Sequence, residues 1–236
     1  MIISFVSEKG GVGKTTLTSN LAIAFRELGK RVLVVDGDFR TASLTLSFGI
    51  TKPPFTILDL LERADLKDVI ISHPSGIEIL ASPISSNLSY LELTGLNFPS
   101  YFDIILIDTQ PSIKASLPFI KLSDKAIIVS TQDIPSLFSA RKVFEKLKKM
   151  GIETGIIVNR YRKIIKKEVI ERFLDLPILG FIPEDDRVLK SFYRGFPAFY
   201  LFPKCRFSKE VRKVAYRILG LNFKESIFDK LFRWLK

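Results

Sequence analysis

The sequence predicts an α/β fold with a mostly parallel central sheet and helices on both of its faces. Short apolar runs typical of buried strands recur at 1–6, 31–35, 76–81, 101–109, 125–130 and 155–158. Segments expected to be helical separate several of these runs, for example 17–28, with apolar residues at helical spacing, and 136–150. Polar residues follow several of the predicted strands, and ligands bind at strand ends in open α/β sheets.

A glycine-rich turn joins the first predicted strand to the first predicted helix. Residues 7–16 read SEKGGVGKTT, which places glycine, lysine and threonine where a phosphate-binding loop requires them. Glycines let backbone N–H groups close around phosphate oxygens, and the following helix presents its unpaired N-terminal donors. The alternative is a glycine-rich turn that arose by chance, but such a turn is not expected to carry the required residue at every one of these positions. The predicted nucleotide-binding residues here are Gly10, Gly11, Val12, Gly13, Lys14, Thr15 and Thr16.

The side chains of this loop have distinct expected roles. Lys14 supplies a positive charge for the β- and γ-phosphates, and the Thr15 hydroxyl is a ligand for Mg²⁺. Asp36 and Asp38 follow the strand at 31–35, and Asp108 follows the apolar run 104–107. Carboxylates at these strand ends can face the phosphate loop, and Asp108 can hold a Mg²⁺-bound water. For Asp36 and Asp38, capping of the next turn or helix is the alternative.

Composition restricts the class of protein. The chain has 236 residues, 47% apolar and 26% charged, which favours one folded domain. A single cysteine, Cys205, excludes a disulfide framework and a CxxC metal site built by one chain. We expect no signal peptide and no membrane-spanning segment, and therefore a cytoplasmic protein.

The positive charge is concentrated near the C-terminus. From residue 204 onward ten Lys or Arg stand against three Asp or Glu, which accounts for +7 of the net charge of +11. An excess of this kind indicates an anionic partner, either a membrane surface or nucleic acid.

The last fourteen residues predict an amphipathic helix. A helical projection of 223–236 gathers the apolar side chains in one half-circle and most polar and basic ones in the other. This pattern is typical of a helix lying in an anionic membrane interface, although a final helix packed on the chain's own core would show it too. We therefore divide the chain into a domain at 1–220 and a C-terminal helix at 221–236. The expected membrane-facing residues are Phe223, Ile227, Phe228, Leu231, Phe232, Trp234 and Leu235.

A second lysine, Lys9, precedes the first glycine of the loop, and the resulting KGGVGKTT resembles the deviant Walker A motif of the MinD/ParA family of P-loop ATPases. The stretches 179–185 (LGFIPED) and 195–198 (GFPA) resemble MinD-like proteins in the same order along the chain. The resemblance implies a P-loop NTPase fold, ATP and Mg²⁺ as cofactors, and a homodimer in the ATP-bound state. It also implies that Lys9 reaches the nucleotide of the partner subunit.

The resemblance assigns roles to further residues. It implies that Asp38 positions the attacking water and that Asp36 lies in the Mg²⁺ hydration shell. Asn159, with Arg160, would contact the adenine edge, and the loop 179–185 would fold over adenine and ribose, through Pro183, Glu184 and Asp185. The tetrad at 159–162 (NRYR) lacks the aspartate with which a GTPase would read guanine, so ATP is favoured.

Other segments depart from the family pattern or carry weaker signals. Gln110 stands where the family usually has a small residue or proline, which leaves open how this loop senses the γ-phosphate. Residues 55–71 predict one helix, and His73 is expected to be an ordinary loop residue. The segment 82–100 is shorter than in MinD-like proteins, so we expect a helix there to be reduced or missing.

These observations lead to three functional hypotheses. The first is a MinD-like, Mg²⁺-dependent ATPase that dimerises on ATP, binds the inner face of the cell membrane through its C-terminal helix and is released by hydrolysis. Such a protein would act in spatial positioning, for example in cell-division site selection, with an activator protein as a further partner. The second is a ParA-like ATPase that binds DNA through 204–217 (KCRFSKEVRKVAYR). The third is an adaptor that binds ATP and hardly hydrolyses it.

Overall fold

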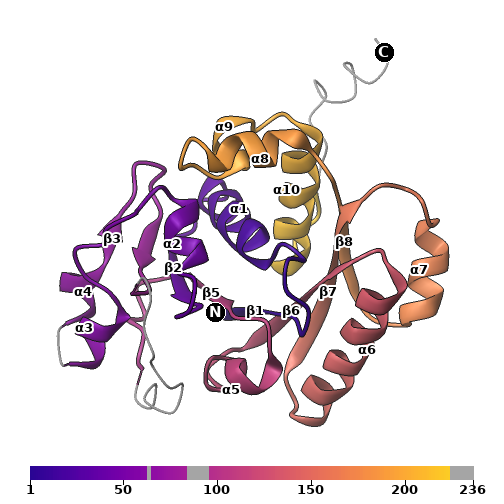
Figure 1. Ribbon diagram of the computed structural model, residues 1–236, viewed down its shortest axis with the longest axis horizontal. Coiled ribbons are helices and arrows are strands. Elements are labelled where there is room, and N and C mark those ends of the chain that lie inside the picture. Colours follow the sequence, from indigo (N-terminus) through magenta and orange to yellow (C-terminus); the bar gives the residue numbers. More distant parts are fainter. Residues whose placement is uncertain (63–64, 84–95, 224–236) are drawn as a thin grey trace.

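A computed structural model describes the chain except for residues 63–64, 84–95 and 224–236 (Figure 1). Within these described residues, eight strands form one sheet in the order β3-β4-β2-β5-β1-β6-β7-β8, and every neighbouring pair is parallel except β3 and β4. This confirms the predicted α/β fold with a mostly parallel sheet. The strands are β1 (Ile2–Val6), β2 (Val32–Gly37), β3 (Ile71–Ser72), β4 (Glu78–Leu80), β5 (Ile104–Thr109), β6 (Lys125–Thr131), β7 (Glu153–Tyr161) and β8 (Ile178–Pro183).

Helices flank the sheet on both faces within the described residues (Figure 1). One apolar cluster joins α1, α2, α9 and α10 to one face of the sheet, and two further clusters join α5, α6 and α7, and α3, α4 and α5, to the other. The helices are α1 (Lys14–Glu27), α2 (Ser43–Ser47), α3 (Ile57–Leu61), α4 (Leu66–Val69), α5 (Ile113–Lys121), α6 (Ile134–Lys149), α7 (Lys167–Leu174), α8 (Asp186–Phe192), α9 (Ala198–Leu201) and α10 (Arg206–Ile218).

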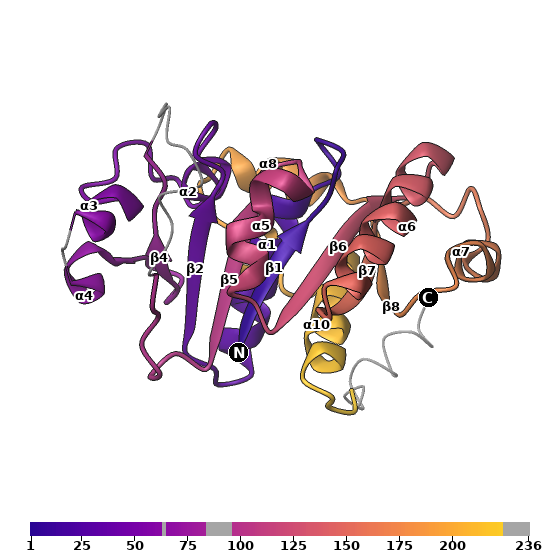
Figure 2. The ribbon, with the colours of Figure 1, turned by 90° about the horizontal axis from the view of Figure 1, so that it is seen from below.

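The central strands are buried on both sides, which explains their unbroken apolar runs. In β1, Ile3 and Phe5 pack toward α1 and α10, whereas Val6 packs toward α5 and α6. Figure 2 shows the parallel strands pointing the same way, so that their C-terminal ends meet at one edge of the sheet. The loop between β1 and α1 lies at this edge. The C-terminal ends of β2 and β5, which carry Asp36 and Asp108, lie at the same edge.

The prediction of one helix over 55–71 is wrong, because this segment contains two short helices and a strand. The Thr56 and Asp59 side chains form a capping box that begins α3, and Asp65 then precedes the separate short helix α4. Ile71 and Ser72 instead form β3, which pairs antiparallel with β4. Strand pairing at the sheet edge thus overrides the helical spacing of the sequence.

His73 lies in the loop after β3, as expected, but it is buried. Its side chain is buried, with its ring 5.0 Å from the Phe48 ring and 4.9 Å from the Phe196 ring. The turn preceding α9 approaches the turn following α2 so closely that a Cβ added to Gly195 would lie 2.8 Å from the Gly49 Cα. His73 is therefore a loop residue whose side chain packs between the loops that carry Phe48 and Phe196, a contact that the sequence did not indicate.

Two other expectations concern the segments at 179–185 and near the C-terminus. Most of 179–185 belongs to strand β8, and only Glu184 and Asp185 lie in the turn before α8. All of the expected helix at 223–236 except Phe223, and most of the segment 82–100, lie outside the described residues. Phe223 is half-buried, with its ring 5.2 Å from the Tyr216 ring of α10, and the domain boundary at 220 stays a prediction. In the described part of the chain, none of the helices has the length and apolar character needed to cross a bilayer.

Candidate nucleotide-binding site

The loop between β1 and α1 has the backbone shape of an anion-binding turn. Gly11 and Gly13 have φ angles of 74° and 92°, in the left-handed region that favours glycine. A Cβ on Gly13 would also lie only 2.2 Å from the Asn159 Nδ2. Gly13 precedes the first turn of α1, so the unpaired N–H groups of that helix face the loop.

Lys14 is held beneath its own loop. The side chain is buried, and its Nζ donates a hydrogen bond to the Ser7 Oγ at 2.9 Å. The pKa of Lys14 is lowered, mainly by burial and to a smaller extent by the charge of Arg40. The charges of Asp108 and Asp38 oppose this shift. The ammonium group is therefore fixed where a bound phosphate would meet it, at the start of α1.

Asp36 and Asp108 are neighbours across the sheet, because the register of β2 and β5 pairs them directly. The Thr15 Oγ1 donates to the Asp108 Oδ2 at 2.5 Å, while the buried Asp108 Oδ1 has no hydrogen-bond partner among the described residues. Burial raises the pKa of Asp108 to about 7, and the charge of Asp36 adds to the shift. A buried carboxylate oxygen without a partner, beside a threonine hydroxyl, fits a hard cation or its bound water.

This site does not surround a metal with protein ligands alone. Across the described residues there is no group of three or more His, Cys, Asp or Glu side chains arranged to hold a metal ion. Mg²⁺ usually keeps several waters and binds through one or two protein oxygens plus substrate phosphates. Thr15 and Asp108 thus fit Mg²⁺ when it arrives with a nucleotide.

Asp36 has a different environment from Asp108. Its Oδ2 accepts hydrogen bonds from the Thr45 backbone N–H at 2.8 Å and the Thr45 Oγ1 at 2.7 Å, and its Oδ1 accepts one from the Asp38 N–H at 3.2 Å. Burial raises the pKa of Asp36 to about 6, against these hydrogen bonds. The carboxylate fixes α2 against the end of β2, and its expected place in the Mg²⁺ hydration shell stays a prediction.

Asp38 lies in a tight turn between β2 and α2. Its Oδ2 accepts a hydrogen bond from the Thr41 Oγ1 at 2.9 Å, and its Oδ1 accepts one from the Arg40 N–H at 3.2 Å. The carboxylate is mostly buried, and its charge acts on both Lys14 and Asp108. The structure therefore brings Asp38 to the same edge as the phosphate loop, while its expected role toward water stays a prediction.

Lys9 points away from Lys14 and toward α6. Its Nζ donates to the Asp133 Oδ1 at 3.0 Å and to the Ser136 Oγ at 2.9 Å. Burial raises the pKa of Asp133, but hydrogen bonds from Thr131, Lys9 and Ser136 outweigh it and hold the pKa well below its usual range. Lys9 must leave these partners before it can reach any nucleotide.

The expected base-binding residues come together around β7 and β8. The Asn159 side chain is buried, and its Nδ2 donates to the Val12 carbonyl oxygen at 2.8 Å, so it supports the phosphate loop. Arg160 is exposed and has a φ of 50°. Glu184 pairs with Arg162, a partner that the sequence did not indicate, and Asp185 caps α8 through the Arg187 N–H. Contact of these residues with adenine stays a prediction.

Gln110 lies at the turn between β5 and α5 and is buried. The Ser116 Oγ donates to its backbone oxygen at 3.2 Å. The following Pro111 lies 3.7 Å from where a Cβ on Gly10 would be, so this turn packs against the phosphate loop. Gln110 therefore lies in a turn beside the phosphate loop.

Sequence reasoning missed the partners that hold these groups. The hydroxyls of Thr45 and Ser136 had no motif to identify them. The Ser136 hydroxyl lies 127 positions from Lys9 in the sequence, and Thr45 reaches Asp36 only because the turn at 38–42 folds α2 back onto the end of β2. Asp133 carried one usable signal, since an aspartate directly before a helix with a proline in its first turn is typical of an N-cap.

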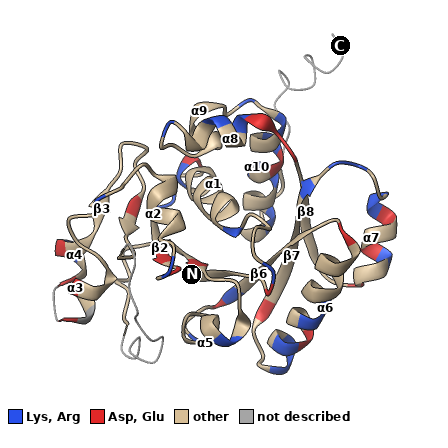
Figure 3. Ribbon diagram, in the orientation of Figure 1, with Lys and Arg blue, Asp and Glu red and all other residues tan. Residues whose placement is uncertain are grey.

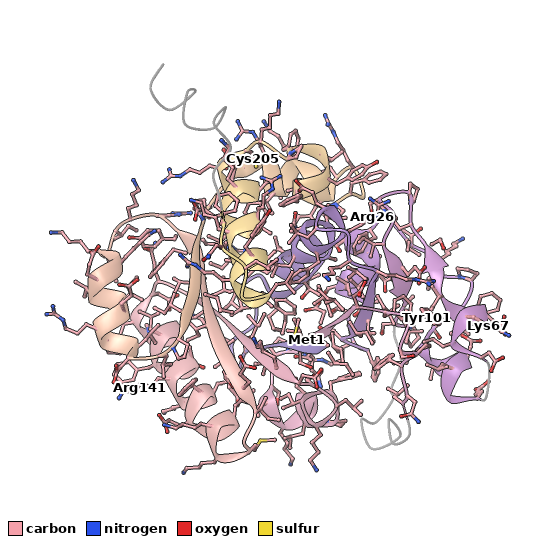
Figure 4. The ribbon with its side chains drawn as sticks, turned by 180° about the vertical axis from the view of Figure 1, so that it is seen from behind. Met1, Arg26, Lys67, Tyr101, Arg141 and Cys205 are labelled. Carbon is pink, nitrogen blue, oxygen red and sulfur yellow. The ribbon has the colours of Figure 1, made fainter. Side chains whose placement is uncertain are left out.

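The basic stretch 204–217 overlaps α10, and two of its basic side chains form ion pairs within the chain. Arg212 binds both carboxylate oxygens of Glu27, at 3.2 and 3.0 Å, and Lys213 pairs with Glu210 at 2.8 Å. Cys205 directly precedes α10 (Figure 4) and caps it, since its Sγ accepts a hydrogen bond from the Ser208 N–H. Figure 3 shows basic residues on α10 and also on α6 and α7, so positive charge is not confined to this helix.

The strand, glycine loop and helix, with Lys14, Thr15 and Asp108 converging on them, define a P-loop nucleotide-binding protein. The family model CbiA, described as the CobQ/CobB/MinD/ParA nucleotide binding domain, matches residues 3–198. The chain belongs to this family.

Three similar proteins illustrate the relationship. An uncharacterized ATP-binding protein of Methanocaldococcus jannaschii is 31% identical over 99% of this chain and 96% of its own length. The cell division ATPase MinD of Pyrococcus furiosus superposes with a TM-score of 0.85 at 31% identity, over 94% of this chain and 99% of that one. The septum site-determining protein MinD of Pyrococcus horikoshii, complexed with Mg-ADP, gives a TM-score of 0.81 at 32% identity, over 92% and 95%.

Proposed function

We propose that this protein is a MinD-like ATPase that binds Mg²⁺·ATP, dimerises around it and hydrolyses it. The observation that carries the proposal is the cluster at the phosphate loop, where Lys14 lies near the Thr15–Asp108 pair and the Asp108 Oδ1 has no hydrogen-bond partner among the described residues. Bound Mg²⁺ would supply charge neutralisation at the β- and γ-phosphates. Lys14 would bind phosphate oxygens, and Asp38 would orient the attacking water.

Dimerisation would complete the site through Lys9. The lysine now pairs with Asp133 in a half-exposed contact, which is weak enough to exchange for a triphosphate. A phosphate carries more charge than a carboxylate and accepts more hydrogen bonds, so a partner's nucleotide would attract Lys9 away from α6. ATP, and not ADP, would then favour the dimer.

The C-terminal helix would connect this cycle to the membrane. A short basic and aromatic helix binds an anionic surface weakly by itself, while two copies on one dimer act together. Hydrolysis would separate the subunits and return them to solution, as expected for a protein that positions other structures at the inner face of the cell membrane. An activator protein could act on the same cycle.

Vesicle sedimentation with full-length protein tests this proposal. Vesicles containing phosphatidylglycerol should sediment the protein with Mg²⁺ and a slowly hydrolysed ATP analogue, and much less with ADP. Leu231→Glu, on the predicted apolar face, should abolish sedimentation, whereas Ser226→Glu adds the same charge on the polar face and should have a small effect. Equal sedimentation with ADP would contradict the switch.

A ParA-like DNA-binding ATPase is the second candidate, favoured by the positive charge on α10. The pairs of Arg212 with Glu27 and of Lys213 with Glu210 reduce the charge available to phosphates there. Removal of residues 223–236 separates the candidates, because membrane binding would be lost while salt-sensitive DNA co-sedimentation would persist. Phosphate release measured with and without vesicles identifies the third candidate, an adaptor that binds ATP without turnover.

A further inference from the structure

We propose that Arg40 is a second phosphate-stabilising cation of this site, which binds the γ-phosphoryl group of the nucleotide on its own chain during hydrolysis. This inference rests on the proposed ATPase activity and adds a residue to it. Neither the sequence motifs nor the family resemblance assigned a role to Arg40.

The fold fixes the backbone position of Arg40. The preceding Phe39 is almost fully buried, with its ring 6.1 Å from the Phe119 ring of α5. On the other side, the Thr41 and Ala42 N–H groups donate to the Asp38 carbonyl oxygen at 3.3 and 2.9 Å, which closes the turn. Arg40 thus lies on a turn anchored at both ends, directly after the β2 edge that carries Asp36 and Asp38.

The guanidinium group is close to the site but only loosely held. Its Nε lies 3.9 Å from the Asp38 Oδ1, longer than the 2.7–2.9 Å typical of a charge-assisted hydrogen bond. The Arg40 side chain is 62% exposed, while the Asp38 side chain is 10% exposed. A cation in this position can exchange a weak carboxylate contact for a phosphate without loss of a strong ion pair.

The surrounding charges also favour this role. The Arg40 charge is felt at Lys14, where it opposes the effect of Asp108 and Asp38 on the lysine pKa. Lys9 is bound to α6, whereas Lys14 and Arg40 are two cations that the structure places at the phosphate edge between β1 and α2. Charge that develops on the transferring phosphoryl group is stabilised by such pre-positioned cations, and arginine offers planar, bidentate hydrogen bonding to phosphate oxygens.

Hydrolysis by Arg40→Ala, Arg40→Lys and wild-type protein tests the inference. Arg40→Ala should lower kcat by about tenfold or more, with KM for ATP changed little, because the contact is made mainly in the transition state. The affinity of Arg40→Ala for Mg²⁺·ADP alone should stay near the wild-type value. Aluminium fluoride, which should tighten the binding of Mg²⁺·ADP to wild-type protein, should not tighten it in Arg40→Ala. Arg40→Lys should restore part of kcat. Arg172→Ala removes an exposed arginine from α7 and should behave as wild type.

The outcomes separate this inference from the proposed function. If the wild-type protein hydrolyses ATP and the Arg40→Ala variant has the same kcat, the inference is overturned and the ATPase proposal stays intact. A wild-type protein that releases no phosphate, with or without anionic vesicles, would overturn both. If Arg40→Ala fails to fold, Arg40→Gln preserves the length of the side chain, and its kcat and aluminium fluoride binding decide the question in the same way.

Discussion

The two lysines of the phosphate loop lie five residues apart, yet the fold holds them in opposite ways. Lys14 is buried beneath the loop and bonded to Ser7, whereas Lys9 is half-exposed and bonded to Asp133 and Ser136 of α6. The first lysine is ready for a phosphate without rearrangement, while the second must exchange partners. The site thus combines a preformed half, built by β1, α1 and β5, with an exposed rim whose cations can move.

The preformed half should be the more sensitive to substitution. We expect Lys14→Ala to lower the rate of ATP hydrolysis by about 100-fold or more, because it removes a pre-positioned charge from the phosphate site. Steady-state phosphate release measures this effect. Lys67→Ala, which removes an exposed lysine on α4 (Figure 4), is the control, and an equal loss in both variants would contradict the assignment.

The backbone of the loop supplies the next largest effect. Gly13→Ala places a side chain in the left-handed region and against Asn159, so we expect a loss of about 1–3 kcal/mol in the free energy of unfolding. Gly29→Ala is a matched control, since Gly29 has a φ of 77° with nothing within 4 Å of its added Cβ. In thermal unfolding, the midpoint temperature of Gly13→Ala should be clearly lower than that of Gly29→Ala. Equal midpoints would mean that the contact with Asn159 is unimportant.

The buried carboxylates predict a specific pH dependence. The pKa of Asp108 is about 7 in the folded protein against an ordinary value of 3.8, so the folded state binds a proton that the unfolded state releases. Between about pH 4 and pH 7, the free energy of unfolding of the nucleotide-free protein should therefore fall as the pH rises, and Asp36, with a pKa of about 6, contributes in the same direction.

Denaturant unfolding at several pH values in metal-free buffer measures this slope. Asp108→Asn should flatten it, whereas Asp68→Asn, at an exposed position on α4, should leave it unchanged. A slope that is the same in Asp108→Asn and wild type would show that Asp108 does not hold the proton.

The exposed rim should give the smallest effect. Asp133→Asn keeps the cap of α6 but removes the charge that holds Lys9, so we expect ATP-dependent dimerisation to strengthen by about two- to fivefold. Glu8→Gln is the matched control, because it breaks the neighbouring Glu8–Lys146 ion pair without touching Lys9. Sedimentation equilibrium with an ATP analogue measures the dimer dissociation constant of both variants. Weaker dimerisation of Asp133→Asn than of wild-type protein would contradict this account.

The same division explains what the sequence could predict. The phosphate loop and Asp108 were identifiable because their spacing and their place at strand ends reflect local chemistry. The contact of Lys9 with Asp133 joins residues 124 positions apart, and the burial of His73 depends on the close approach of Gly49 and Gly195. Neither relation leaves a local signal. The helix expected at 55–71 failed for a related reason, because Ile71 pairs with Ile79 of β4.

Light scattering coupled to size-exclusion chromatography tests the central claim most directly. The 236-residue chain has a mass of 26.8 kDa. Wild-type protein with Mg²⁺ and a slowly hydrolysed ATP analogue should have about twice this mass, while the ADP-bound protein and the Lys9→Ala variant should be monomers. A wild-type protein that binds the analogue but stays monomeric, or a Lys9→Ala variant that dimerises equally well, would contradict the account.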